Sequence, residues 1–447
     1  MMFLVLAMLV PVFAQKKQIE DVTYRRSSLH LVLVTTDEPL LKEAEVMESW
    51  KNYPFPDKYD QLSVDFKTFS SGKPAVSAME YATKVANGEI PLPTTIAALK
   101  QLQEDTDGKA YIESLKKIVE NKIAEEKLAH QLLAKWFNIQ PDGSCDMELI
   151  QERGRYNATE LDAMVADKAA RGKAILADAG EELISNTFVQ FCKLDFYENE
   201  PIAKFAKMVA YAIANIAGGD AVRMAADVAY NAAKTGYSAR TLAMLYKLNW
   251  NDSIMAEFYN IWTAENRLDY AKFQALPFEM KFVGANVSTS TTSDSKAAAA
   301  AVFGVPTGNK SAEEKEEVDV KLINKTVIRN IDKVFAKMQK KYEVFKPKFP
   351  VLSNPPLTAQ LGMKEGIEGG EQFEILETVW NDKLAKREYK RVGIVKVDKK
   401  QIWDNRYNAG EGNEKKQIDK KTGEPIMSTL FTKSKVAFPG MLLRQMK

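Results

Sequence analysis

Two stretches decide the fold: TFVQFCKLDFY at residues 187–197 and TLAMLYKLNW at residues 241–250. Both have the length and composition of strands. In the second stretch apolar side chains alternate, and the following are expected on one face: Leu242, Met244, Tyr246, Leu248 and Trp250. The two stretches therefore predict strands of one sheet.

The segment between them, residues 201–236, is rich in Ala, Asn and Gly, a composition that favours closely packed helices over a strand. Its alanines recur at four-residue steps, first at Ala206, Ala210 and Ala214 and then at Ala225, Ala229 and Ala233. The spacing predicts two helices inserted between the strands. They are expected either to cover one face of the sheet or to dock on a lipid surface or a partner.

Upstream of these strands the pattern alternates between strand and helix. A strand is predicted at residues 25–36, a helix at 40–50, a strand at 64–70 and a long helical region at 96–137. Asn157 with Glu160 can form a capping box that starts a further helix. This order predicts an α+β fold with a mixed sheet in a domain spanning residues 15–300.

Downstream, FEMKFV at residues 278–283 alternates as a strand, and the following Ser/Thr run is either an exposed strand edge or the start of a loop. Residues 301–346 are expected to form a linker and an amphipathic helix, with a short strand at 318–323. The helix, at 326–345, has apolar residues on one side and lysines opposite, so it is expected to dock on the first domain.

From residue 347 the pattern has period two, which predicts a small C-terminal β domain at residues 347–447. Its many short strands favour a small barrel or curled sheet. The expected strands lie at 357–361, 372–379, 389–397, 401–407, 428–434 and 441–445.

The first fourteen residues, MMFLVLAMLVPVFA, are wholly apolar. They predict a secretory signal peptide cut after Ala14, with a buried N-terminal helix or strand as the alternative. The run is shorter than the roughly 20 residues of a spanning helix. If the chain is exported, we expect the protein in the periplasm or outside the cell. Association with the outer membrane is a further expectation. In that compartment Cys145 and Cys192 form either one disulfide or two separate buried thiols.

Charge is uneven along a chain whose formal net charge is +2. Residues 381–447 hold 17 Lys and Arg against 8 Asp and Glu, a local charge of +9 that leaves −7 for the rest. This basic end is either a solvated surface or a contact for an anionic envelope polymer, lipid headgroup or acidic partner. Nucleic acid is excluded as a partner by export and by the lack of interleaved basic and aromatic residues.

The residues that usually carry chemistry are scarce. The two histidines, His30 and His130, are a hundred residues apart, and a structural or surface role is expected for each. The sequence contains no nucleophile elbow, no cysteine-protease signature, no metal-ligand spacing and no phosphate-binding loop. We therefore predict no catalytic, cofactor-binding or metal-binding residue and no cofactor.

Three stretches of the sequence carry resemblances. ERGRYNATELDAMVADKAARGKAILADAGEELISNTFVQF at 152–191 resembles uncharacterised secreted proteins of Bacteroides-type gut bacteria. The layout of 107–250 is similar to the envelope family of the curli secretion lipoprotein, although the acylated cysteine and clear membrane hairpins of that family are missing. GMKEGIEGGEQFEILE at 362–377 is similar to the β-barrel modules of flagellar T-ring proteins. The resemblances imply an envelope role and transfer no functional residue.

Together these observations predict an exported, non-catalytic protein that binds or scaffolds components of the cell envelope. A hydrolase of envelope polymers that uses carboxylates is the alternative, and it would require a deep pocket with paired acidic residues. A homo-oligomeric ring is a third hypothesis, which the layout of the curli-type family permits.

Overall fold

The larger part of the chain is organised around a six-stranded mixed sheet. Strand β1 is parallel to β2, β3 and β4, whereas β4, β5 and β8 are antiparallel neighbours, in the order β2-β1-β4-β5-β8 with β3 also on β1. The strands are β1 (Ser27–Thr35), β2 (Tyr59–Gln61), β3 (Thr68–Ser70), β4 (Thr187–Glu198), β5 (Tyr237–Leu248) and β8 (Met280–Thr292). The two deciding stretches are thus adjacent strands, with Phe191 opposite Met244.

The computed structural model describes residues 27–72, 78–92, 109–146, 148–149, 180–217, 219–293, 311–381, 386–410, 417–419 and 423–446. The predicted signal peptide and the Asn157 capping box lie outside these ranges, as does most of the 152–191 resemblance.

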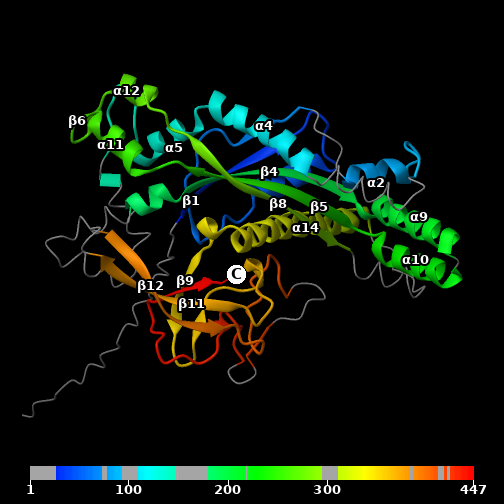
Figure 1. Ribbon diagram of the computed structural model, residues 1–447. Coiled ribbons are helices and arrows are strands. Elements are labelled where there is room, and N and C mark those ends of the chain that lie inside the picture. The colour runs from blue at the N-terminus through cyan, green and yellow to red at the C-terminus, as the bar shows by residue number, and fades with distance from the viewer. Residues whose placement is uncertain are drawn as a thin grey trace, which may run out of the picture.

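Helices cover both faces of the sheet, which explains why β4 and β5 are buried along nearly their whole length (Figure 1). On one face lie α4 (Lys109–Glu125), α5 (Leu128–Phe137), α11 (Asp252–Asn260) and α12 (Tyr270–Ala275). On the other lie α1 (Glu43–Lys51) and α14 (Ala312–Lys341). The α+β prediction is confirmed.

Helix α14 is longer than expected. The Ser311 hydroxyl oxygen accepts a hydrogen bond from the backbone N–H of Glu314, and the Glu314 carboxylate accepts one from the backbone N–H of Ser311. This capping box starts the helix well before residue 326. The predicted strand at 318–323 is wrong, because Ile323, Val327 and Ile331 continue one helical stripe that packs on the sheet. The predicted docking of this helix on the sheet domain is confirmed.

The lysines of α14 close the edge of the sheet. Lys333, Lys337 and Lys341 lie one helical turn apart and donate through Nζ to successive outer carbonyls of β8. The acceptors are Thr289 at 2.8 Å, Val287 at 2.8 Å and Ala285 at 3.1 Å. The Ser/Thr run is therefore an edge strand, as one of the two interpretations held, and lysines of α14 cap that edge.

The C-terminal part is a second, antiparallel sheet of order β12-β11-β14-β9-β10-β13. Its strands are β9 (Lys348–Ser353), β10 (Thr358–Ala359), β11 (Gln372–Asn381), β12 (Lys386–Lys396), β13 (Thr429–Leu430) and β14 (Leu442–Gln445). Strand β9 was not predicted, because Pro347 and Pro350 suggested a boundary. The predicted strand at 401–407 is wrong: the segment makes a single bridge, from Trp403 to Gly362.

The two outer strands of this second sheet approach one another just beyond their ends. Val397 bridges Phe431, the amide of Asp398 donates to the carbonyl of Leu430 at 2.8 Å, and Thr432 donates to Lys396 at 2.8 Å. The sheet therefore curls until its edges meet at one place.

The structure distinguishes between the two alternatives for the cysteines, one disulfide or two separate thiols. Cys145 and Cys192 are free and buried, so the disulfide interpretation is wrong for this structure. Burial raises the pKa of Cys192 to about 12 and that of Cys145 to about 11. Both thiols are therefore protonated and unreactive at neutral pH.

Candidate functional site

The insert between β4 and β5 is a hairpin of two helices, α9 (Asn199–Ala217) and α10 (Asp220–Ala233). Figure 1 shows it projecting beyond the end of the sheet. Apart from the packing of its two helices on each other, its main packing partner within the described ranges is α2 (Ala78–Ala86). The interpretation that the insert covers a sheet face is therefore wrong, because α9 begins directly where β4 ends and carries the chain outward.

The base of this hairpin is fastened to the sheet by Asn199, which is buried. Its Nδ2 donates to the carbonyls of Thr235 at 2.8 Å and Thr292 at 3.0 Å, and its Oδ1 accepts from the Ser238 hydroxyl at 2.7 Å. Next to it, Gly236 has a φ of +90°, and a Cβ there would lie 2.1 Å from the Thr292 carbonyl oxygen. These contacts fix the direction in which the hairpin projects.

The two helices face each other through polar side chains. Asp227 of α10 accepts from Lys207 Nζ at 2.6 Å and from Tyr211 Oη at 2.9 Å, both on α9, and Tyr230 donates to Glu200 at 3.0 Å. The hydrogen bonds from Lys207 and then Tyr211 lower the pKa of Asp227. Buried alanines lie between the helices, namely Ala203, Ala214 and Ala226.

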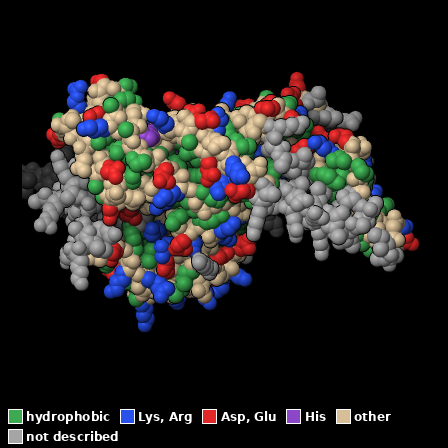
Figure 2. All heavy atoms as spheres, turned by 45° about the horizontal axis from the view of Figure 1, so that its top comes forward, with side chains coloured by type: hydrophobic (Ala, Val, Ile, Leu, Met, Phe, Trp, Pro, Cys, Tyr) green, Lys and Arg blue, Asp and Glu red, His purple; other side chains and the backbone are tan. Residues whose placement is uncertain are grey.

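Because the polar side of α10 faces α9, its apolar side faces outward. Every exposed residue of α10 after Asp220 is apolar: Ala221, Val222, Met224, Ala225, Val228, Ala229, Ala232 and Ala233. We call these eight residues the outer face of α10. Met224 is 70% exposed and Val228 is 60% exposed, the former the most exposed large apolar side chain described. Figure 2 shows apolar side chains at the end of the molecule where the hairpin projects.

The equivalent side of α9 is not left open. Figure 1 shows α9 between α2 and α10. Helix α2 packs against α9, and its small residues Ala82, Val85 and Ala86 are buried. Three helices thus form a layer, closed at one side by α2 and open at the outer face of α10.

A surface groove of about 400 Å³ lies between the α4–α5 turn and the start of β8. Its floor is apolar, with Ile123 and Phe278, and its polar lining includes Glu120, Glu279 and His130. His130 Nε2 is buried with no hydrogen-bond partner among the described residues. Burial, and then the nearby Lys127 charge, lower the pKa of His130. The imidazole is therefore neutral at pH 7.

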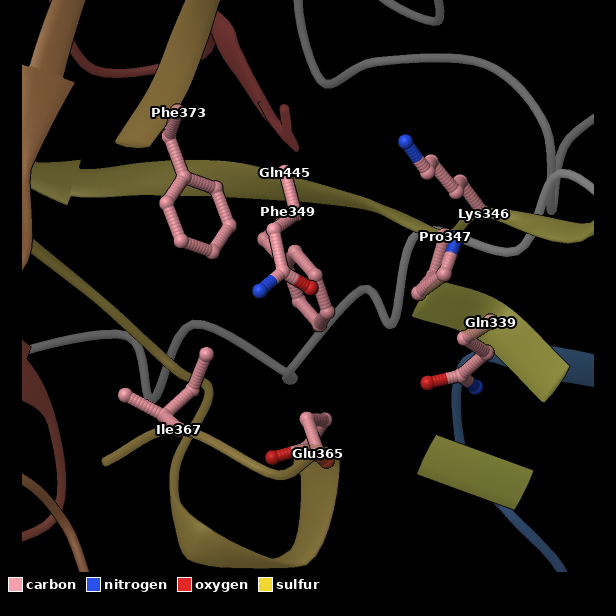
Figure 3. Close-up of a pocket in the computed structure, with 8 residues that line it drawn as sticks. All are labelled: Gln339, Lys346, Pro347, Phe349, Glu365, Ile367, Phe373 and Gln445. Atoms are coloured by element: carbon pink, nitrogen blue, oxygen red, sulfur yellow. The ribbon is translucent and has the colours of Figure 1, made fainter. Parts of the chain in front are cut away.

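A second cavity lies where α14 meets the C-terminal sheet. Figure 3 shows Gln339 of α14 and Glu365 lining it from opposite segments, with the ring of Phe349 beyond them. Its free volume of about 10 Å³ has room for one water, so this is not a substrate site. Burial raises the pKa of Glu365, whose Oε2 accepts from the Gly362 amide at 2.7 Å and from Asn405 at 2.9 Å.

A buried ionic cluster lies on the sheet near the base of the hairpin. Asp195 of β4 pairs with Lys193 on the same strand and with Arg240 of β5, whose NH1 is 3.0 Å from Asp195 Oδ2. All three side chains are at most 10% exposed. The Arg240 guanidinium also lies over the Tyr111 ring of α4, at 5.6 Å from its centroid. The cluster fastens β4, β5 and α4 together.

The structure places the two histidines as follows. His30 is buried in β1, and its Nε2 is 2.7 Å from the Phe66 carbonyl. His130 lines the groove, in a place that sequence reasoning had no signal to find. No trio of His, Cys, Asp or Glu within the described ranges is arranged to hold a metal ion.

Comparison with known proteins gives no relative on which to base an assignment. No protein-family model matches the chain, and no curated protein matches it significantly. Among the described helices, none has both the length and the apolar character that crossing a membrane requires.

Proposed function

We propose that the protein is an exported, non-catalytic binding or scaffolding protein of the cell envelope, and that it docks through the outer face of α10. The observation that supports docking is a hairpin fastened at its base by Asn199, whose apolar side faces solvent. Burying the exposed surface of Met224 and Val228 would stabilise a complex at roughly 25 cal/mol per Å². Export is supported by the apolar leader at 1–14.

The C-terminal sheet is proposed as a barrel-like module that meets an anionic envelope component. The contacts between Val397 and Phe431 support closure of its edges. Lys390, Arg391 and Lys396 of β12 are exposed, which supports an anionic partner. Figure 2 shows basic side chains along the lower part of the molecule, where this sheet lies.

The hydrolase remains the second candidate because of the groove. Glu120 and Glu279 both line it, beside neutral His130. Two carboxylates on one cleft are the arrangement that polymer hydrolysis requires. Release of soluble fragments from isolated envelope polymer, abolished by both Glu120→Gln and Glu279→Gln, would establish this function in place of the first.

The docking proposal is tested by fractionating cells that express the full chain. The wild type should be retained in the envelope fraction with an N-terminus at Gln15, and Met224→Glu with Val228→Glu should release it to the soluble exported fraction. The matched control is Met427→Glu, which changes a methionine that is 59% exposed on the C-terminal part. Unchanged retention of the double variant would exclude docking through α10. Recovery of protein with an intact Met1 from the cytosol would exclude export.

A further inference from the structure

We propose that the outer face of α10 is covered by the outer face of α10 from a second copy of this chain, packed antiparallel about a two-fold axis. The inference rests on the proposed docking function, since it names a second copy of this chain as what that surface docks on. The contact with the envelope then falls to the basic C-terminal sheets, two in each dimer, and the double variant is released because each monomer has only one. It commits to a protein surface rather than to lipid.

The chemistry of the outer face disfavours a membrane. Helices that lie on lipid carry Trp, Phe or Leu on the apolar side and Lys or Arg on a solvated polar side. The outer face consists of five alanines, two valines and one methionine, and the polar side of α10 is occupied by α9. Asp220, at the tip of the hairpin with its side chain 93% exposed, would have to enter the headgroup region.

Small side chains instead favour a helix as the partner, because they allow two helix axes to approach closely. The chain already covers the matching side of α9 in this way, with Ala82, Val85 and Ala86 of α2. A second α10 would continue the layer α2–α9–α10 across its open side. Such a contact would repeat, on the open side of the layer, the helix packing that α2 makes on α9.

The outer face is also complementary to itself. It carries no charge, so two copies bring no like charges together, and antiparallel packing aligns the two helix dipoles favourably. One helix face of this length buries on the order of 400 Å² per copy, half of the roughly 800 Å² per partner in a standard interface. The dimer is therefore expected to be weak, with a Kd on the order of 10–1000 µM.

Sedimentation velocity of the full mature chain tests self-association. The weight-average sedimentation coefficient of the wild type and of Met427→Glu should rise between about 5 µM and about 1 mM, the range that spans the expected Kd. That of Met224→Glu with Val228→Glu should not rise. A wild type that stays monomeric throughout, or a double variant that associates equally, would overturn the proposal.

Engineered cysteines test the antiparallel register. Around a two-fold axis near Val228, residues 221 and 233 of opposite copies meet, whereas two copies of residue 221 lie about 18 Å apart. Ala221→Cys and Ala233→Cys should therefore form a disulfide dimer when mixed and not when oxidised separately. The native thiols do not interfere, because both are buried and protonated. Cross-linking of Ala221→Cys to itself would overturn the antiparallel arrangement.

The two proposals fail in distinguishable ways. If the wild type is monomeric but the double variant still leaves the envelope fraction, docking holds and the second copy is excluded as the partner. If the wild type binds vesicles of phosphatidylethanolamine and phosphatidylglycerol and the double variant does not, lipid is the partner and the dimer is rejected.

Discussion

Removing the three lysines that cap β8 should convert the monomer into an aggregating species. The proposed change is Lys333→Met, Lys337→Met and Lys341→Met, which keeps the aliphatic stems and deletes the donors. Four residues of helix rise about 6.0 Å and two residues of strand about 6.7 Å, so three lysines match three outer carbonyls with little distortion. The substitution therefore leaves the Thr289 and Val287 carbonyls without their donors, whereas the Ala285 carbonyl keeps the Tyr342 hydroxyl at 2.8 Å.

The expected loss follows from these contacts. Two of the three hydrogen bonds are exposed and the third, from Lys337, is half-buried, so water replaces part of each bond. We assign about 1 kcal/mol to each of the two bonds whose acceptor loses its donor, less than for a buried bond to a charged group, or about 2 kcal/mol in total. Burial also lowers the pKa of Lys337, which shows that its charged form is held at some cost in solvation. The larger effect should be edge-to-edge pairing of β8, a strand of thirteen residues.

The assay is thermal unfolding followed by light scattering at matched concentrations. The triple variant should unfold at a lower temperature and form multimers before unfolding. The control triple, Lys51→Met, Lys204→Met and Lys321→Met, removes the same charge from exposed helix positions. A capping variant that remains monomeric, with the unfolding temperature of the control, would refute the idea that these lysines protect the edge.

Three further changes have expected outcomes. Asn199→Ala removes one buried and two half-buried hydrogen bonds, about 3 kcal/mol, so amide exchange should accelerate in 199–236 but not in β4 and β5. Equal acceleration everywhere would contradict a local role of Asn199 at the base of the hairpin. Burial raises the pKa of Glu365, so its contribution to stability is full below the unfolded pKa of about 4.3 and is lost as pH rises through the folded pKa. Glu365→Gln should therefore flatten the fall of Tm between pH 4 and 8, and an unchanged slope would sink this reasoning. Asp195→Asn leaves Lys193 and Arg240 buried without their carboxylate and should cost about 3–5 kcal/mol in urea unfolding, whereas a change under 1 kcal/mol would show that the cluster is solvated.

The sequence was sufficient for elements whose pattern is set by burial alone. Leu242, Met244 and Tyr246 alternate because they share the face of β5 that packs on α4 and α5, and their spacing predicts the strand directly. Ile331 and Val334 mark the helix that covers the opposite face. Such signals depend on which residues are buried and not on what buries them.

Features that depend on tertiary partners could not be predicted. The lysines of α14 look solvated in sequence, and only the pairing of helix and strand shows that they reach β8 carbonyls. Amphipathic spacing in α10 reveals two unlike sides without stating which one faces α9. The groove beside His130 joins segments about 150 residues apart, so no local motif marks it.

The exposed surface of α10 contrasts with how the described chain treats its other open edges. Strand β8 is capped by lysines, β2 and β3 are three residues long, and β12 carries exposed Lys390 and Lys396. Each of these devices limits unwanted association at a place where a sheet could recruit another strand. On α10, by contrast, Arg223, Asp227 and Tyr230 bond to α9, and the large apolar side chains of Met224 and Val228 are exposed to water. An exposed apolar helix face has no use in a monomer whose described sheet edges are protected. It therefore supports the proposal that a partner covers the outer face of α10.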